Sequence, residues 1–186
     1  AYVAGVELIP GIMRTMTEGI FAKFAHDPYK GLEAIQGEGR SYLETDPRKW
    51  DLISLMNIHT EHGPYCTLAP ENLHTVEGAE LLLSKLTDRG ILVYEEILMT
   101  PRSDLAFYKS LNTISEALRK SGAKNPMDHI HIFQWDFDPG ALFRTLTVKR
   151  TPFTPEEARQ MDAFVDLCKS WEKYYHGVNL MYSPHR

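Results

Sequence analysis

Cysteine is scarce in this chain, with only Cys66 and Cys168 among its 186 residues. Two cysteines do not make the disulfide scaffold of a small secreted domain, so a reducing, cytoplasmic compartment is expected. Long hydrophobic runs are absent too, since no stretch approaches the roughly 20 apolar residues that a helix needs to cross a bilayer. Positive charge is not in excess, because the formal net charge is -5. This balance argues against nucleic acid or an anionic membrane surface as the main partner.

In its other residue types, the chain has the composition of an ordinary globular domain. Hydrophobic residues make up 43% of the chain and charged residues 24%, which is enough apolar material for one proper core at this length. No internal repeat, low-complexity tract or linker is visible. We therefore expect one domain over residues 1–171 and a C-terminal tail over residues 172–186.

Strand-like and helix-like patterns alternate along the chain. Short apolar runs predict strands at Val3–Glu7, Leu32–Gln36, Trp50–Asn57 and Ile91–Glu96. Helical spacing predicts helices over residues 12–24, 71–86, 105–120 and 155–171. Two late runs flank the turn DFDPG and predict an antiparallel hairpin. This order predicts an α/β fold with a mostly parallel sheet, helices on both faces and a C-terminal hairpin, in which the apolar strand at 50–57 is central.

Ligands of such sheets bind beyond the carboxyl ends of the parallel strands. Four strand ends therefore matter: Glu7, the turn after Gln36, Asn57 with its following loop, and Glu95 with Glu96. A carboxylate at Glu7 is suited to both hydroxyls of a ribose, because it offers acceptor sites for each and no competing donor. Taken alone, Glu7 is better explained as a solvated acid at the N-terminus of a helix.

Four segments come in order along the chain: VAGVELIPGI, IQGEGRSYLE, WDLISLMN and ENLHTVEGAELLLSKLTDRGILVYEE. With the later TPFTPEEARQM, they resemble the spermidine synthase-like branch of the class I S-adenosylmethionine-dependent transferases. The similarity extends to the synthase-like domains attached to large bacterial membrane proteins, and it covers about Val3–Met161. It implies a Rossmann-like fold, with S-adenosylmethionine or its decarboxylated form as cofactor and an amine or another small nucleophile as acceptor. It also implies a cytoplasmic location, either as a separate protein or as the cytosolic domain of a membrane protein.

The resemblance implies a cofactor-binding set, residue by residue. Glu7 matches the acid that holds the ribose hydroxyls. Glu38 matches an acid, usually aspartate, that accepts from the adenine amino group, and Gly37 and Gly39 keep that backbone close to the base. Asn57 stands where the family has the first aspartate of its D-[ST]-[ST]-D motif, a position that serves both cofactor binding and catalysis.

On the substrate side, Thr60 falls near the second aspartate of that motif and Glu61 is the adjacent acid. Carboxylates at these positions would accept a proton from an amine and balance its charge. Asn57 and Thr60 do neither near neutral pH. Two functions therefore stay open: a nucleoside-binding transferase, or a non-catalytic Rossmann-like binding or interaction module of a larger, membrane-attached protein.

The resemblance also places Val3–Glu7 as the second strand of the family fold. The first strand and the glycine-rich loop that packs against the methionine part of the cofactor are not found in these 186 residues. We therefore expect a fragment of a longer protein. The gap in its sheet would be covered by an upstream segment, a second copy of the chain or an altered strand order.

The loop NIHTEHGPYC suggests a metal-binding site, because His59, His62 and Cys66 have the spacing of metal ligands and His74 lies nearby in the sequence. No C-x-x-C pair anchors this loop, so we favour a polar loop over the substrate cleft and expect no metal. A zinc-stabilised interaction domain is the third and weakest hypothesis.

Overall fold

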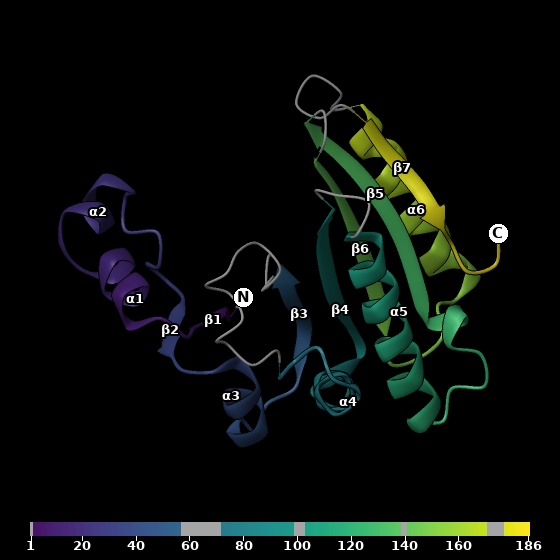
Figure 1. The fold of residues 1–186 in the computed structure, drawn as a ribbon, viewed down its shortest axis with the longest axis horizontal. Helices are drawn as coiled ribbons and strands as arrows, with labels where there is room; N and C mark the ends of the chain where they lie inside the picture. The colour runs from purple at the N-terminus through teal and green to yellow at the C-terminus, as the bar shows by residue number, and fades with distance from the viewer. Residues whose placement is uncertain (1, 57–71, 99–102, 139–140, 171–176) are drawn as a thin grey trace. The chain divides into compact units, whose positions relative to one another are not determined.

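The computed structural model of the chain describes residues 2–56, 72–98, 103–138, 141–170 and 177–186. The chain divides into two compact units, Ala1–Pro47 and Arg48–Arg186. Each unit is described by itself (Figure 1).

The first unit is built on a small parallel sheet with three helices. Its elements are β1 (Ala4–Glu7), α1 (Pro10–Thr17), α2 (Gly19–Phe24), β2 (Glu33–Gln36) and α3 (Gly39–Thr45). β1 and β2 pair in parallel, with Glu7 opposite Gln36. They form a two-stranded sheet of their own.

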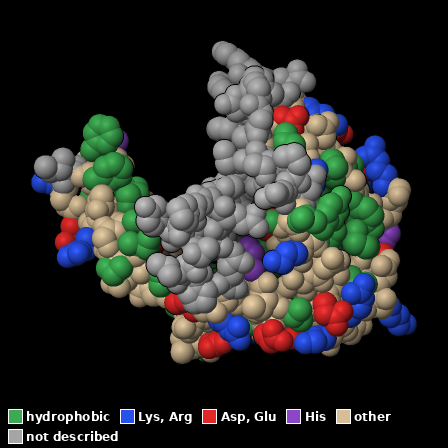
Figure 2. Space-filling view, in the orientation of Figure 1, with side chains coloured by type: hydrophobic (Ala, Val, Ile, Leu, Met, Phe, Trp, Pro, Cys, Tyr) green, Lys and Arg blue, Asp and Glu red, His purple; other side chains and the backbone are tan. Residues whose placement is uncertain are grey.

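The helix predicted over residues 12–24 is two helices, and this part of the prediction is wrong. The backbone of Glu18 is extended and Gly19 has a φ of +81°, which ends α1 and begins α2. Glycine adopts this φ without the clash that a Cβ would cause. The apolar residues that were expected on one face of a single helix are therefore divided between two helices, and Phe24 is 79% exposed. Figure 2 shows hydrophobic side chains gathered on the surface of this unit.

The second unit carries a five-stranded sheet. Its strands are β3 (Trp50–Met56), β4 (Leu86–Leu98), β5 (Ile130–Asp138), β6 (Ala141–Lys149) and β7 (Gly177–Tyr182), in the spatial order β3-β4-β6-β5-β7. β3 and β4 are parallel, and the other neighbours are antiparallel. The predicted hairpin is therefore present as β5 and β6. β7 lies within the stretch expected as a tail.

Helices cover both faces of this sheet (Figure 1). They are α4 (Val76–Ser84), α5 (Ser103–Lys120) and α6 (Pro155–Lys169), with the short 3₁₀ helix η2 (Pro126–His129) before β5. α5 reaches the sheet through Ser110, which donates to Glu96 of β4 at 2.6 Å. α6 packs on the opposite face, where Val165 and Cys168 form a core with Phe133 and Val178. The layered arrangement confirms the Rossmann-like α/β class.

The prediction that Trp50–Met56 is central is wrong for this sheet, although its parallel pairing with β4 is confirmed. β3 is the first strand in the order, and among the described residues β4 is its only sheet neighbour. Leu55 is buried, but Leu52, which points to the other face, is 57% exposed. An apolar sequence indicates burial, but it does not say how many neighbours a strand has.

Candidate functional site

Glu7, Gly37, Glu38 and Gly39 meet at one edge of the small sheet. β1 and β2 run in parallel, so both of their carboxyl ends lie at this edge. The ladder continues one step further, because the backbone N–H of Gly37 donates to the carbonyl oxygen of Glu7 at 3.0 Å. Parallel pairing therefore joins two segments that are far apart in the sequence, and the predicted cofactor-binding residues of this unit lie together.

The Glu7 carboxylate is half-buried and tied to the backbone that follows it. Its Oε1 accepts a hydrogen bond from the N–H of Ile9 at 2.7 Å. Ile9 is the residue before α1, and Pro10 is the first residue of that helix. A carboxylate has about four lone-pair sites, so this bond orients Glu7 and leaves it able to accept from two further hydroxyls.

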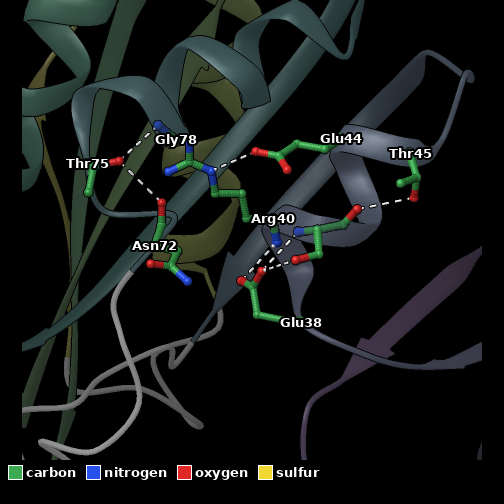
Figure 3. Close-up of polar contacts among 8 residues, drawn as sticks. Glu38, Arg40, Glu44, Thr45, Asn72, Thr75 and Gly78 are labelled. Carbon is green, nitrogen blue, oxygen red and sulfur yellow. Dashed lines mark hydrogen bonds and ion pairs between the residues drawn. The ribbon is translucent and has the colours of Figure 1, made fainter.

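Glu38 is the N-terminal cap of α3, a role that the sequence did not predict because only a turn was expected there. One carboxylate oxygen accepts from the N–H of Arg40 at 3.0 Å, and the other accepts from the N–H and the hydroxyl of Ser41 at 2.9 and 3.0 Å. Figure 3 shows these bonds converging on the Glu38 side chain. A glutamate is an uncommon cap, since shorter polar residues are preferred.

These bonds fix the charge of Glu38 as well as its position. Partial burial alone would raise the pKa of Glu38, but the hydrogen bonds from Arg40 and Ser41 outweigh it and hold the pKa below its ordinary value. Glu38 is therefore an ionised acceptor at neutral pH. The Cβ position of the preceding residue, Gly37, is open, because apart from its two chain neighbours no described residue lies within 4 Å of it.

The second predicted group lies outside the described residues. It comprises Asn57, Thr60 and Glu61, together with the loop residues His59, His62 and Cys66. Among the residues that the structure describes, no three His, Cys, Asp or Glu side chains gather as a metal site would require. No described helix has the length and apolarity needed to cross a bilayer.

The chain enters α4 through a tight turn (Figure 3). The hydroxyl of Thr75 accepts from the N–H of Gly78 at 3.0 Å and donates to the carbonyl oxygen of Asn72 at 3.2 Å. A Cβ on Gly78 would lie 2.6 Å from that carbonyl oxygen. The glycine therefore lets the first turn of α4 pack directly on the backbone that precedes it.

Glu95 ends the parallel pairing of β3 with β4, and Glu96 follows it. In the β3–β4 register, Glu95 lies opposite Met56, the residue immediately before Asn57. Both acids are buried, with 5% and 3% of their surfaces exposed. They point to opposite faces of the sheet because neighbouring residues of a strand alternate.

No family model matches this chain, and no curated protein matches it in sequence. Solved structures match it in fold. A spermidine synthase in complex with the transition state analogue AdoDATO superposes with a TM-score of 0.54 and 14% identity, over 85% of this chain and 49% of that one. Spermidine synthase from Thermotoga maritima gives 0.56 and 14%, over 85% and 50%.

A probable spermidine synthase from Corynebacterium glutamicum gives a TM-score of 0.53 and 15% identity, over 88% of this chain and 52% of that one. The chain thus spans about half of the length of the structures that it matches. At this level of identity the similarity shows the fold alone, which this chain shares with the solved spermidine synthases.

Proposed function

We propose, from this fold, that the chain is a spermidine synthase-like domain that binds a nucleoside of the S-adenosylmethionine type. The cofactor would be S-adenosylmethionine or its decarboxylated form. The observation that carries the proposal is the meeting of Glu7 and Glu38 at the carboxyl edge of the parallel β1–β2 pair. Ligands of open α/β sheets bind at this kind of edge.

In this proposal the two acids bind opposite ends of the nucleoside. Glu7, oriented by the N–H of Ile9, accepts from the ribose hydroxyls. Glu38, ionised and held by the start of α3, accepts from the adenine amino group. Gly37 and Gly39 have no side chains to keep the flat base away from the backbone. The geometry supports this set because each acid keeps free acceptor sites after its own hydrogen bonds are counted.

The acceptor side of the proposed transferase would be formed by Asn57, Thr60 and Glu61. An amine acceptor is cationic at neutral pH and must lose a proton before its nitrogen attacks. Asn57 and Thr60 supply neither the base nor the negative charge that this requires. We therefore propose that the catalytic step of this domain is weakened. Glu61 is the acid nearest in sequence to Asn57 and Thr60.

The alternative is a non-catalytic binding or interaction module of a larger, membrane-attached protein on its cytoplasmic side. The same two departures, Asn57 and Thr60, favour it. So does β3, which has an exposed Leu52 and, among the described residues, a single neighbouring strand. A parallel strand at a sheet edge is normally covered. We propose an upstream part of a longer protein, or a second copy of the chain, as the partner that covers it.

The proposal is tested by calorimetric titration of the full chain with S-adenosylmethionine, its decarboxylated form and methylthioadenosine. Replacing Glu7→Ala should weaken binding about 10- to 150-fold, which corresponds to ~1.5–3 kcal/mol for hydrogen bonds to a charged group. Glu33→Ala is the matched control, because it removes an acid from the opposite end of the same small sheet, at the start of β2. Equal dissociation constants for the Glu7→Ala variant and the unmodified chain would reject Glu7 as the ribose ligand.

A further inference from the structure

The first unit, described from residue 2 to residue 47, has almost no hydrophobic core. Among its described side chains, Ala22 and Leu43 are the only apolar ones that are buried. They are buried in the chain as a whole, so the unit on its own buries no more than these two. Large hydrophobic side chains are instead exposed, namely Tyr2, Val3, Leu8, Ile9, Ile12, Phe21 and Phe24. A unit this small that buries so little apolar surface lacks the main source of folding free energy.

Local structure does not make up for the missing core. α1, α2 and α3 have 8, 6 and 7 residues, whereas an isolated helix shorter than about 12 to 15 residues is marginal in water. β1 and β2 have four residues each and, among the described strands, pair only with one another. A two-stranded sheet is likewise marginal. The first unit therefore has low stability, in contrast to the larger sheet, where Leu92, Leu146 and Val148 are fully buried.

The two proposed nucleoside ligands lie at the two ends of the segment that has to fold. Glu7 ends β1 and Glu38 caps α3, and residues 8–37 between them contain α1, α2 and β2. Each acid is oriented by backbone N–H groups within three residues of it. Bringing the two acids together requires β1 to pair with β2, which costs the conformational entropy of the segment between them. A ligand that contacts both acids binds the folded form and not the unfolded one, so it shifts the equilibrium toward folding.

We propose that the first unit is largely unfolded without a ligand and folds when a nucleoside binds to Glu7 and Glu38. This inference rests on the proposed function, because that nucleoside is the ligand. It adds a conformational step to it: the second unit is folded throughout, and the first folds together with the cofactor. The observed association constant is then the intrinsic one multiplied by the fraction of molecules in which the first unit is folded. Substitutions that change the stability of this unit should therefore change nucleoside affinity even where they lie outside the site.

Hydrogen exchange of the full chain tests the proposal, with methylthioadenosine as the probe. The informative amide is that of Glu33, which donates to the carbonyl oxygen of Val3 at 2.9 Å, at the end of the small sheet away from Glu7. A nucleoside at the carboxyl edge does not cover this amide, so folding of the unit is what protects it. Without ligand it should exchange at nearly the rate of an unstructured peptide, while the amides of β4 and β6 are protected. With the probe at 100 times its apparent Kd, exchange should slow about 100-fold.

Two results of this experiment would overturn the proposal. One is a Glu33 amide that, without ligand, is protected as strongly as the amides of β4. The other is protection by the probe that reaches the amide of Gly37, at the carboxyl edge, but not that of Glu33. The second result would show that the nucleoside covers nearby backbone without folding the unit.

Two substitutions in α1 give a second test, in opposite directions. Gly11→Ala raises the helix propensity of α1 at a position where the new Cβ has open space, and it should strengthen methylthioadenosine binding up to about fivefold. Thr15→Pro, at an exposed position of the same helix, should weaken binding roughly 100-fold. Neither should change the urea unfolding of the second unit. Unchanged affinity in both variants would show a unit that is already folded, and it would overturn the proposal.

The proposed function and this inference can fail separately. If methylthioadenosine binds to a chain whose Glu33 amide is already protected, the nucleoside function stands and this inference is wrong. If S-adenosylmethionine, its decarboxylated form and methylthioadenosine all fail to bind, the proposed function is wrong and the coupling to a nucleoside falls with it. Rapid exchange of the Glu33 amide beside protected amides of β4 would in that case still show that the first unit does not stay folded on its own.

Discussion

His131 of β5 is fully buried, and its two ring nitrogens have different surroundings. Nε2 lies 3.0 Å from Asp162 Oδ1 of α6. Nδ1 is buried and has no hydrogen-bond partner among the described residues. The neutral ring with its proton on Nε2 satisfies this arrangement, because Nε2–H donates to the carboxylate. Protonation would place a second N–H at Nδ1, where burial would leave it unpaired.

The protein should therefore lose stability in mild acid through His131. Burial lowers the pKa of His131 and outweighs the hydrogen bond and charge of Asp162, which raise it. The unfolded chain then binds the proton more readily, so the free energy of unfolding falls as pH drops below about 6.5. One proton gives a slope of at most about 1.4 kcal/mol per pH unit. Urea unfolding between pH 7.5 and 5 measures it.

The matched variant for this measurement is His131→Phe, which suits the neighbouring rings of Phe133 and Phe153. It removes the titrating group but leaves the other seven histidines of the chain unchanged. The slope of stability against pH should become shallower in this variant. Identical slopes for the two proteins would show that His131 does not carry the acid sensitivity.

At the scale of elements, α6 shows what local sequence can predict. Thr154, Pro155 and the following glutamates predicted its start, and the structure has a full capping box between Thr154 and Glu157. The break between α1 and α2 was missed because an apolar stripe with a spacing of four continues across Gly19, and periodicity does not register a single positive φ. α3 was missed because a glutamate is a weak capping signal.

The tight start of α4 gives a prediction about packing. Gly78→Ala should destabilise the protein by about 1–3 kcal/mol, because the new Cβ would lie 2.6 Å from the Asn72 carbonyl oxygen and 2.9 Å from Leu73 Cα. The backbone has to shift, and this outweighs the gain of up to ~1 kcal/mol that alanine brings to a helix. Thermal and urea unfolding both report the change. Gly11→Ala in α1 is the control, since nothing lies within 4 Å of its Cβ position, and it should not destabilise.

For the molecule as a whole, the order of segments in the sequence predicted the spermidine synthase-like fold, and the solved structures confirm it. The meeting of Glu7 with Glu38 was also predictable, because parallel strands bring their carboxyl ends to one edge. The edge position of β3 was not, since strand order depends on pairings between distant segments. From the sequence, Glu95 could be predicted only as an acid at the end of a strand. Its pairing with Thr145, whose hydroxyl accepts from Trp135 Nε1, depends on the register of three strands.

The last prediction concerns catalysis: the 186-residue chain should not transfer an aminopropyl group to putrescine at a measurable rate. Two sequence features support this. First, the chain contains no G-x-G-x-G segment, which by resemblance would hold the methionine part of the donor, and positioning accounts for ~7–11 kcal/mol of a reaction barrier. Second, Asn57 and Thr60 replace the carboxylates of the family motif, and a general base contributes ~100- to 10,000-fold to the rate.

The two losses act on different substrates, so repairing one should not restore the reaction. Product formation from decarboxylated S-adenosylmethionine and putrescine is measured for the chain, for its Asn57→Asp variant, and for both forms extended with an N-terminal strand that ends in G-x-G-x-G. Only the extended Asn57→Asp form should turn over well, and the extended Asn57 form should bind nucleoside but react slowly. Fast turnover by the unmodified chain would contradict the assignment of both the donor site and Asn57.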